Sequence, residues 1–87
     1  MAEPDWREQL YTLVAAIPPG TTASYGALAQ QISGASARSV ARALSQLPED
    51  TRLPWHRVIR ADGRVADHPG RAEQTRRLRT EGVIIRP

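Results

Sequence analysis

Two short amphipathic segments joined by a tight connection constrain the fold more than any other feature. Ser24 precedes the segment from Tyr25 to about Ser33, and Ser36 precedes the segment from Ala37 to about Gln46. Serine accepts hydrogen bonds from the first free N–H groups of a helix, so both serines are typical helix N-caps. Gly34 lies between the segments and ends the first one. Two capped helices joined in this way predict a helix-turn-helix.

The other elements are one helix before this pair, a hairpin after it and a final helix. Apolar residues recur at helical spacing from Asp5 to Ile17, behind Pro4, where a first-turn proline is tolerated. Asp62-Gly63 separates two extended arms and predicts a β-hairpin. The segment from Gly70 to Gly82 predicts the last helix, with Gly82 as its stop. We therefore expect a mainly α fold with a small β-hairpin, a winged helix-turn-helix-like DNA-binding domain.

Chain length and composition bound the class of protein. A chain of 87 residues is long enough for one modest core, so residues 1–87 are expected to form a single domain. The sequence has no cysteine and only two histidines, so we expect no metal and no cofactor. The N-terminus MAEPDWREQL is unlike a signal peptide, and no apolar run approaches the roughly 20 residues of a membrane span. We expect a cytoplasmic protein with no membrane contact.

Positive charge is concentrated in the second half of the chain. Residues 1–50 carry three arginines against five acidic residues, and residues 51–87 carry nine against four. All 12 basic residues are arginine, whose forked guanidinium suits phosphate, although a GC-rich genome produces the same bias. We expect Arg42, Arg64 and Arg71 to follow phosphates, and the last helix to present a solvated face with Arg76, Arg77 and Arg79.

The stretch LPWHRV places a tryptophan where a short extended segment is expected. Only 5% of the residues are aromatic, so the position of Trp55 is informative. Pro54 before it and His56-Arg57 after it are unlike a core strand, which favours a tryptophan that faces a ligand. Burial in the core is the alternative.

The segments TTASYGALA, ARSVARAL and LPWHRVI, followed by DGRV and TEG, resemble the DNA-binding domain of O6-alkylguanine-DNA alkyltransferases in order and spacing. In those enzymes the cysteine of a Pro-Cys-His-Arg-Val motif accepts the alkyl group. Trp55 stands at that position here, which is characteristic of the alkyltransferase-like proteins. An indole is no alkyl acceptor and the chain has no cysteine, so we expect no enzymatic activity.

The resemblance implies a damage-recognition protein that binds O6-alkylguanine in double-stranded DNA. Its third helix would enter the minor groove, bend the DNA and flip the damaged nucleotide into a pocket. The complex would flag the lesion for the damage-recognition proteins of nucleotide excision repair and would block alkyltransferases. We expect a monomer, because no dimerisation element is visible. The alternatives are a sequence-specific regulator that reads the major groove and an enzyme in which His56 activates water.

The resemblance also assigns roles on the DNA side. Arg38 matches the arginine finger that fills the gap left by the flipped base, and Tyr25 matches a tyrosine that presses on the 3′ phosphate of that nucleotide. A solvated surface arginine and a half-buried structural tyrosine are the alternatives. The other residues expected to contact DNA, some of which capping or turn roles explain equally well, are Thr22, Ser24, Ser36, Ser39 and Arg42.

The pocket expected from the resemblance lies around Trp55, which would offer it a large apolar surface. His68-Pro69 replaces a Tyr-Ser pair of the enzymes, and Pro69 lacks the N–H that would contact the O6 region, which implies a looser pocket for larger adducts. His56 and Glu81 match a relay that activates the cysteine, and we expect them to remain as a structural pair. Arg57 would brace the loop or contact phosphate. The full set of expected pocket residues is Tyr25, Pro54, Trp55, Val58, His68, Pro69 and Gly70.

Overall fold

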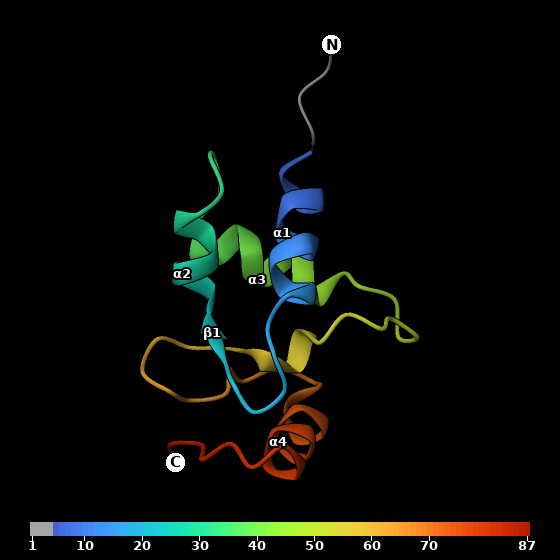
Figure 1. Cartoon of the computed structure of the whole chain (residues 1–87), viewed down its shortest axis with the longest axis vertical. Helices are drawn as coiled ribbons and strands as arrows, with labels where there is room; N and C mark the ends of the chain where they lie inside the picture. The colour runs from blue at the N-terminus through green and yellow to red at the C-terminus, as the bar shows by residue number, and fades with distance from the viewer. Residues whose placement is uncertain (1–4) are drawn as a thin grey trace.

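The computed structural model describes residues 5–87 and divides around a small central sheet (Figure 1). The helices α1 (Trp6–Ala15), α2 (Tyr25–Gln30) and α3 (Ala37–Ser45) lie on one side of this sheet, and α4 (Arg71–Thr80) lies on the other. A short 3-10 helix, η1 (Trp55–Arg57), leads directly into the second strand. The expectation of a mainly helical fold with a small sheet is confirmed.

Serine caps define the helix-turn-helix. The Ser24 Oγ accepts a hydrogen bond from the N–H of Ala27 at 3.1 Å. Ser36 and Ser39 cap α3 reciprocally, because each hydroxyl accepts the backbone N–H of the other, at 3.1 and 2.8 Å. Gly34 in the connection has a φ of 84°, in the left-handed region that favours glycine. The predicted pair of helices is therefore present, although α2 ends at Gln30, earlier than expected.

The first and last helices also begin and end at identifiable residues. The Asp5 carboxylate caps α1 by accepting the N–H of Arg7 at 3.0 Å, and the expectation for Pro4 lies outside the described residues. After α4, Gly82 has a φ of 82° and the N–H of Val83 donates to the Leu78 carbonyl at 3.0 Å. This is a Schellman ending, and it confirms Gly82 as the helix stop.

The small sheet is not the expected hairpin. It pairs β1 (Ala23–Ser24) with β2 (Val58–Ile59) in parallel, with Ala23 opposite Val58. The Asp62-Gly63 turn does form, and it is closed by a hydrogen bond from the Arg60 N–H to the Arg64 carbonyl at 2.9 Å. Within residues 5–87 the arm beyond this turn forms no strand. The turn residues thus reverse the direction of the chain. The strand before the turn, β2, pairs instead with the distant strand β1.

Strand β2 divides the apolar interior into two clusters. Val58 is fully buried in the larger cluster, which α1, α2 and α3 build around Leu10, Val14 and Val40. Ile59 points into the smaller cluster, with Val65 and the α4 residue Leu78. Neighbouring residues of a strand face opposite sides, so this two-residue strand anchors both clusters. The segment that carries Trp55 is therefore held between them.

Candidate functional site

A cavity of about 440 Å³ opens between α3, η1 and the cavity loop, the name used here for residues 66–70. This volume lies within the range of small-ligand sites, which is roughly 300–1,000 Å³. Trp55 is half-buried and forms part of the wall, so it faces the cavity and is not a core residue. The lining residues are Tyr25, Ala41, Leu44, Ser45, Leu47, Glu49, Trp55, Ala66, Asp67, His68, Pro69 and Gly70.

The structure brings most of the expected pocket residues together. Tyr25 and the three loop residues His68, Pro69 and Gly70 line the cavity with Trp55. Pro54 does not line it: it precedes η1 as its N-cap residue. Val58 does not line it either, because this residue is fully buried in the larger apolar cluster.

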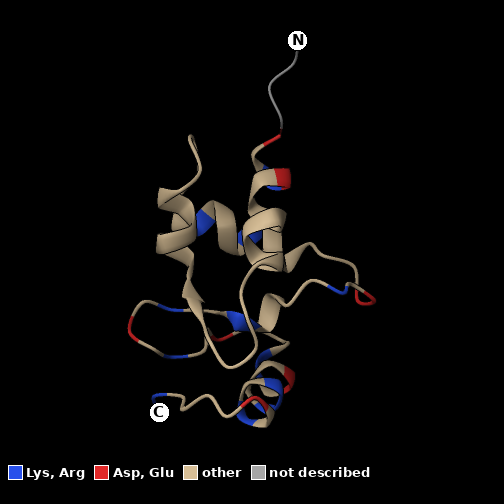
Figure 2. Ribbon diagram, viewed as in Figure 1, with Lys and Arg blue, Asp and Glu red and all other residues tan. Residues whose placement is uncertain are grey.

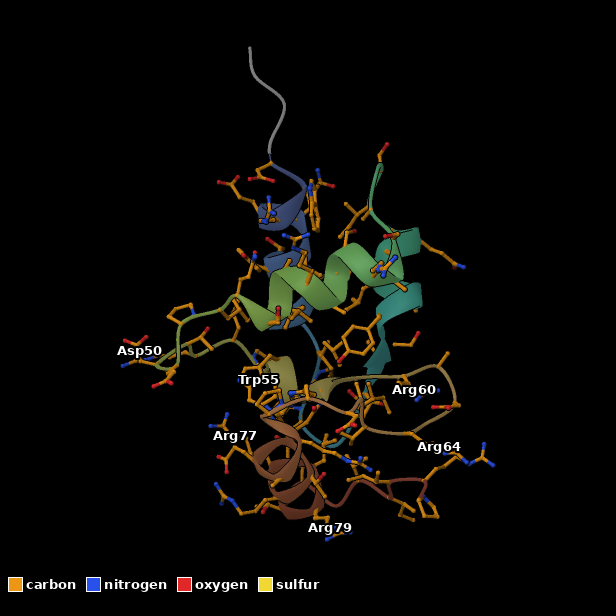
Figure 3. The ribbon with its side chains drawn as sticks, turned by 180° about the vertical axis from the view of Figure 1, so that it is seen from behind. Asp50, Trp55, Arg60, Arg64, Arg77 and Arg79 are labelled. Atoms are coloured by element: carbon orange, nitrogen blue, oxygen red, sulfur yellow. The ribbon has the colours of Figure 1, made fainter. Side chains whose placement is uncertain are left out.

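Trp55 is held by contacts on several sides, and it lies in a 3-10 turn and not in the extended segment expected. The His68 ring meets it edge-on, with the centroids 6.2 Å apart and the planes at 75°. The guanidinium carbon of Arg77 lies 5.6 Å from the indole centroid, a cation–π contact from α4. Figure 3 shows Trp55 and Arg77 as neighbours. Arg77 was expected on a solvated helix face, and this contact corrects that expectation.

Gly70 leaves the space in which His68 and Trp55 approach each other. A Cβ added at this position would lie 3.0 Å from His68 Cε1 and 3.5 Å from Trp55 Cη2. Its φ of −86° is accessible to any residue, so the requirement is for space and not for a special backbone conformation. The cavity loop therefore depends on glycine at the point where it meets the indole.

A cluster of polar and charged residues connects η1 to the end of α4 and to the segment after α1. The Arg57 guanidinium donates to both Glu81 carboxylate oxygens, at 3.1 and 2.6 Å, and its Nη1 donates to the Ile17 carbonyl at 2.8 Å. The hydrogen bonds from Arg57, with a further one from His56 Nε2 at 3.2 Å, lower the pKa of Glu81 to about 2. His56 is buried, and its Nδ1 has no hydrogen-bond partner among the described residues. Arg57 thus braces the turn.

The residues expected to contact DNA fall into two groups. Arg38 and Arg42 are exposed on α3, and Figure 2 shows α3 with basic positions, unlike α2. Neither arginine makes an ion pair with another residue of the range 5–87. The serine hydroxyls, by contrast, are engaged as helix caps. Thr22 is exposed next to β1.

Tyr25 stands at the boundary between the two functions expected of the site. It is the first residue of α2 and a half-buried wall of the cavity. Burial raises the pKa of its hydroxyl, which keeps the group neutral and able to donate a hydrogen bond. One tyrosine therefore presents both an apolar ring and a donor at the cavity.

The α3 wall of the cavity was missed in the sequence. Ala41, Leu44 and Ser45 lie along α3 at i, i+3 and i+4, and Ala41 is three residues after Arg38. Residues at this spacing share one helix face, so the position of Arg38 gave a signal for the wall. Glu49 and Asp67 also line the cavity, and nothing in their sequence context indicates this.

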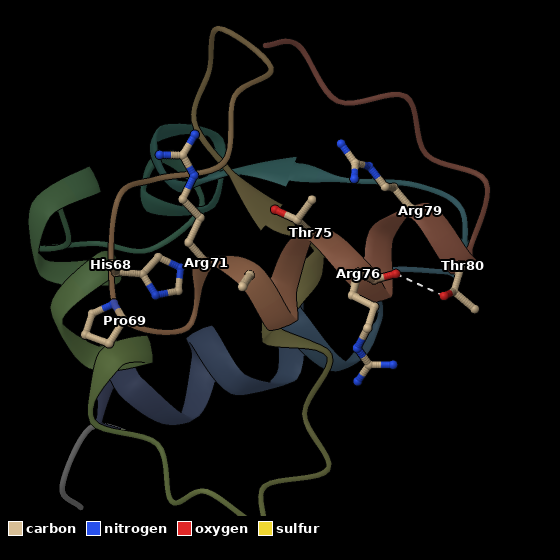
Figure 4. A pocket seen from close by; sticks show the side chains of 8 residues that line it. His68, Pro69, Arg71, Thr75, Arg76, Arg79 and Thr80 are labelled. Carbon is tan, nitrogen blue, oxygen red and sulfur yellow. Dashed lines mark hydrogen bonds between the residues drawn. The ribbon is translucent and has the colours of Figure 1, made fainter.

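A second hollow, of about 890 Å³, follows the outer face of α4 (Figure 4). Its walls include Arg71, Arg76 and Arg79, all exposed, which agrees with the solvated face expected for the last two. Arg76 pairs with Glu73 at 2.6 Å. His68 and Pro69 line this hollow as well as the cavity, so the cavity loop is the wall between the two.

Within residues 5–87, no group of three or more histidine, cysteine, aspartate or glutamate side chains is arranged to hold a metal ion. Within the same part of the chain, every helix is too short or too polar to cross a bilayer.

Comparisons with known proteins agree with this architecture. Residues 5–83 match the family described as "6-O-methylguanine DNA methyltransferase, DNA binding domain". The chain is 36% identical over 85 residues to the "DNA base-flipping protein" of Escherichia coli, covering 95% of this chain and 66% of that protein. It is 37% identical over 81 residues to "Alkyltransferase-like protein 1" of Schizosaccharomyces pombe, covering 88% and 75%.

A solved structure extends the likeness to three dimensions. The crystal structure of Schizosaccharomyces pombe Atl1 in complex with damaged DNA containing O6-carboxymethylguanine superposes with a TM-score of 0.86 and 34% identity, covering 99% of this chain and 83% of that one. The likeness therefore includes the helix-turn-helix, the sheet and the helix that follows. The chain belongs to the family of the 6-O-methylguanine DNA methyltransferase DNA-binding domain, as an alkyltransferase-like member of it.

Proposed function

We propose that this protein binds O6-alkylguanine in duplex DNA and holds the flipped base in the cavity beside Trp55, without repairing it. The observation that carries the proposal is a cavity of about 440 Å³ with Trp55 in its wall, bordered by the helix that carries Arg38. A large apolar wall suits a base that has left the stack, which it contacts by its face or through its alkyl group.

Arg38 would take the place of the extruded base. It is the second residue of α3 and is exposed, so its guanidinium can extend from the helix N-terminus toward a duplex. A planar guanidinium can stack between neighbouring bases and hydrogen-bond to the orphaned partner. Tyr25, which lines the cavity, would press against the phosphate of the flipped nucleotide and donate a hydrogen bond from its neutral hydroxyl.

The absence of cysteine from the sequence supports binding without alkyl transfer. Direct transfer needs a soft nucleophile that can be deprotonated near neutral pH, and the indole of Trp55 is not one. The protein would therefore act by occupying the lesion. We further propose that the occupied lesion is passed to damage-recognition proteins of nucleotide excision repair, and that alkyltransferases are blocked meanwhile.

The test compares affinities for two duplexes of one sequence, with and without a single O6-methylguanine, at one salt concentration. We expect tighter binding to the damaged duplex, and Arg38→Ala should reduce this preference. Arg79→Ala is the matched control, since it removes the same charge from an exposed position on α4. Equal affinity of the wild-type protein for both duplexes would refute the proposal.

A second assay addresses the absence of repair. Excess protein is incubated with the damaged duplex, and the restoration of unmodified guanine is measured. Any restoration would show that the protein is an enzyme. In the same mixture, an added alkyltransferase should repair the duplex more slowly when this protein is bound first.

A further inference from the structure

Gln74 is a buried polar residue that has no part in the roles discussed so far for Trp55 and α3. It lies on α4 in the polar run RAEQTRRLRT and retains only 1% of its accessible surface. Its side-chain amide donates to two backbone carbonyls, those of His56 at 3.1 Å and Val58 at 2.8 Å. Both carbonyls belong to the segment that carries Trp55, so Gln74 fixes α4 to that segment.

The remaining polar atom of Gln74 contacts the cavity loop. Its Oε1 lies 2.7 Å from His68 Nε2, and His68 Nδ1 accepts the N–H of Gly70 at 3.0 Å. Because Nδ1 acts as an acceptor, Nε2 must carry the proton and donate it to Gln74. One side chain therefore links the segment of Trp55 to the cavity loop, and it accepts the Nε2 proton of the tautomer that the Gly70 N–H also favours.

This chain of hydrogen bonds controls what the cavity loop offers a ligand. Both ring nitrogens of His68 are used within the protein, the N–H of Gly70 is used as well, and Pro69 has none. His68 is left to present its carbon edge, which already meets the Trp55 ring at 75°. The two rings are adjoining parts of the cavity wall, so their relative position shapes the cavity.

We infer that Gln74 is a positioning residue for base recognition: it holds His68 at a set distance from Trp55, and so determines how well the cavity distinguishes a damaged base. The inference rests on the proposed function. Gln74 is not among the lining residues, so its effect on a bound base passes through His68.

The first test measures lesion preference, which is the ratio of affinities for the damaged and undamaged duplexes. Gln74→Met keeps the length of the side chain and removes its three hydrogen bonds, and we expect the ratio to fall about five- to tenfold, within the range for substitutions that act on a site without contacting its ligand. Thr80→Ala, an exposed change on the same helix, is the control and should leave the ratio unchanged. An unchanged ratio in folded Gln74→Met would overturn the inference.

A double-mutant cycle separates positioning from a general loss of stability. His68→Phe keeps a ring beside Trp55, cannot bond to Gln74, and leaves the two bonds from Gln74 to backbone carbonyls in place. If Gln74 acts through His68, the double variant should lose no more preference than either single variant. Additive losses would contradict the inference. Should Gln74→Met fail to fold, an unchanged ratio in His68→Phe would contradict it as well.

A third measurement needs no DNA. At a pH where the His68 ring is neutral, nitrogen NMR of the free protein should show the proton on Nε2, and Gln74→Met should shift the Nε2 resonance because the hydrogen bond to Gln74 Oε1 is lost. A mixture of the two tautomers already present in the wild-type protein would overturn the inference. A wild-type protein without lesion preference would instead refute the proposed function, so the two failures are distinguishable.

Discussion

Replacing Glu81 with glutamine removes the carboxylate that joins Arg57 to His56. The pKa of Glu81 is lowered from an ordinary 4.5 to about 2, first by the hydrogen bond from Arg57 and then by that from His56, against the opposing effect of burial. A shift of this size corresponds to roughly 3 kcal/mol of folding free energy. The side chains of Arg57 and Glu81 keep 14% and 17% of their surface, so solvent screening trims this to about 2–3 kcal/mol.

The sign of the pH dependence follows from the direction of the shift. A carboxyl group whose pKa is lower in the folded state stabilises the protein fully above pH 4.5, and loses this contribution as the pH falls toward 2. We therefore expect Glu81→Gln to be about 2–3 kcal/mol less stable than the wild type at pH 7, which for a domain of this size lowers the Tm by roughly 10–20 °C. The difference should shrink steadily below pH 4.5.

Urea unfolding followed by circular dichroism, at several pH values from 7 down to 2.5, measures this difference. Glu73→Gln is the matched control: Glu73 also pairs with two arginines, Arg76 and Arg77, but at the solvent-exposed surface of α4. Its loss should leave the unfolding midpoint close to that of the wild type. If Glu81→Gln and the wild type differ by the same amount at pH 7 and pH 2.5, the half-buried carboxylate is not the source of the stability.

Three further substitutions test the cavity and its surroundings. Gly70→Ala should weaken binding to damaged duplex more than to undamaged duplex, because its Cβ would lie 3.0 Å from the His68 ring; equal losses would contradict the steric argument. Tyr25→Phe should cost less affinity than Tyr25→Ala if the ring supports the flipped nucleotide, and the reverse order would count against that role. Trp55→Cys places a thiol beside the His56–Glu81 pair, so alkyl transfer to its Sγ from O6-methylguanine, with release of guanine, is expected; an unmodified thiol would show that the pair no longer activates it.

Features that depend on neighbouring residues were predictable from the sequence. The caps Ser24 and Ser36 and the stop at Gly82 act over a few residues, and the structure places them as predicted. The parallel pairing of β1 with β2 was not predictable, since strands of two residues show no periodicity.

The supports of the cavity were hidden for a related reason. Arg77 and Gln74 lie in a largely polar stretch of sequence. The packing of α4 against η1 places Arg77 over the indole of Trp55 and buries Gln74. The contact of Arg57 with the Ile17 carbonyl spans 40 residues of chain. Long-range contacts of polar residues leave no local pattern in the sequence. These contacts were therefore not predicted.

The cluster around Glu81 gives His56 and Glu81, which the resemblance assigns to a relay in the enzymes, a structural role that needs no cysteine. Glu81 follows α4, His56 and Arg57 belong to η1, and Arg57 reaches the Ile17 carbonyl just after α1. Removing one member would leave some hydrogen-bonding groups of the others buried or half-buried and unpaired, which costs more than the net gain of an intact bond. Because these contacts hold together the segments that carry Trp55, the residues are needed for the shape of the cavity even when no thiol is there to be activated.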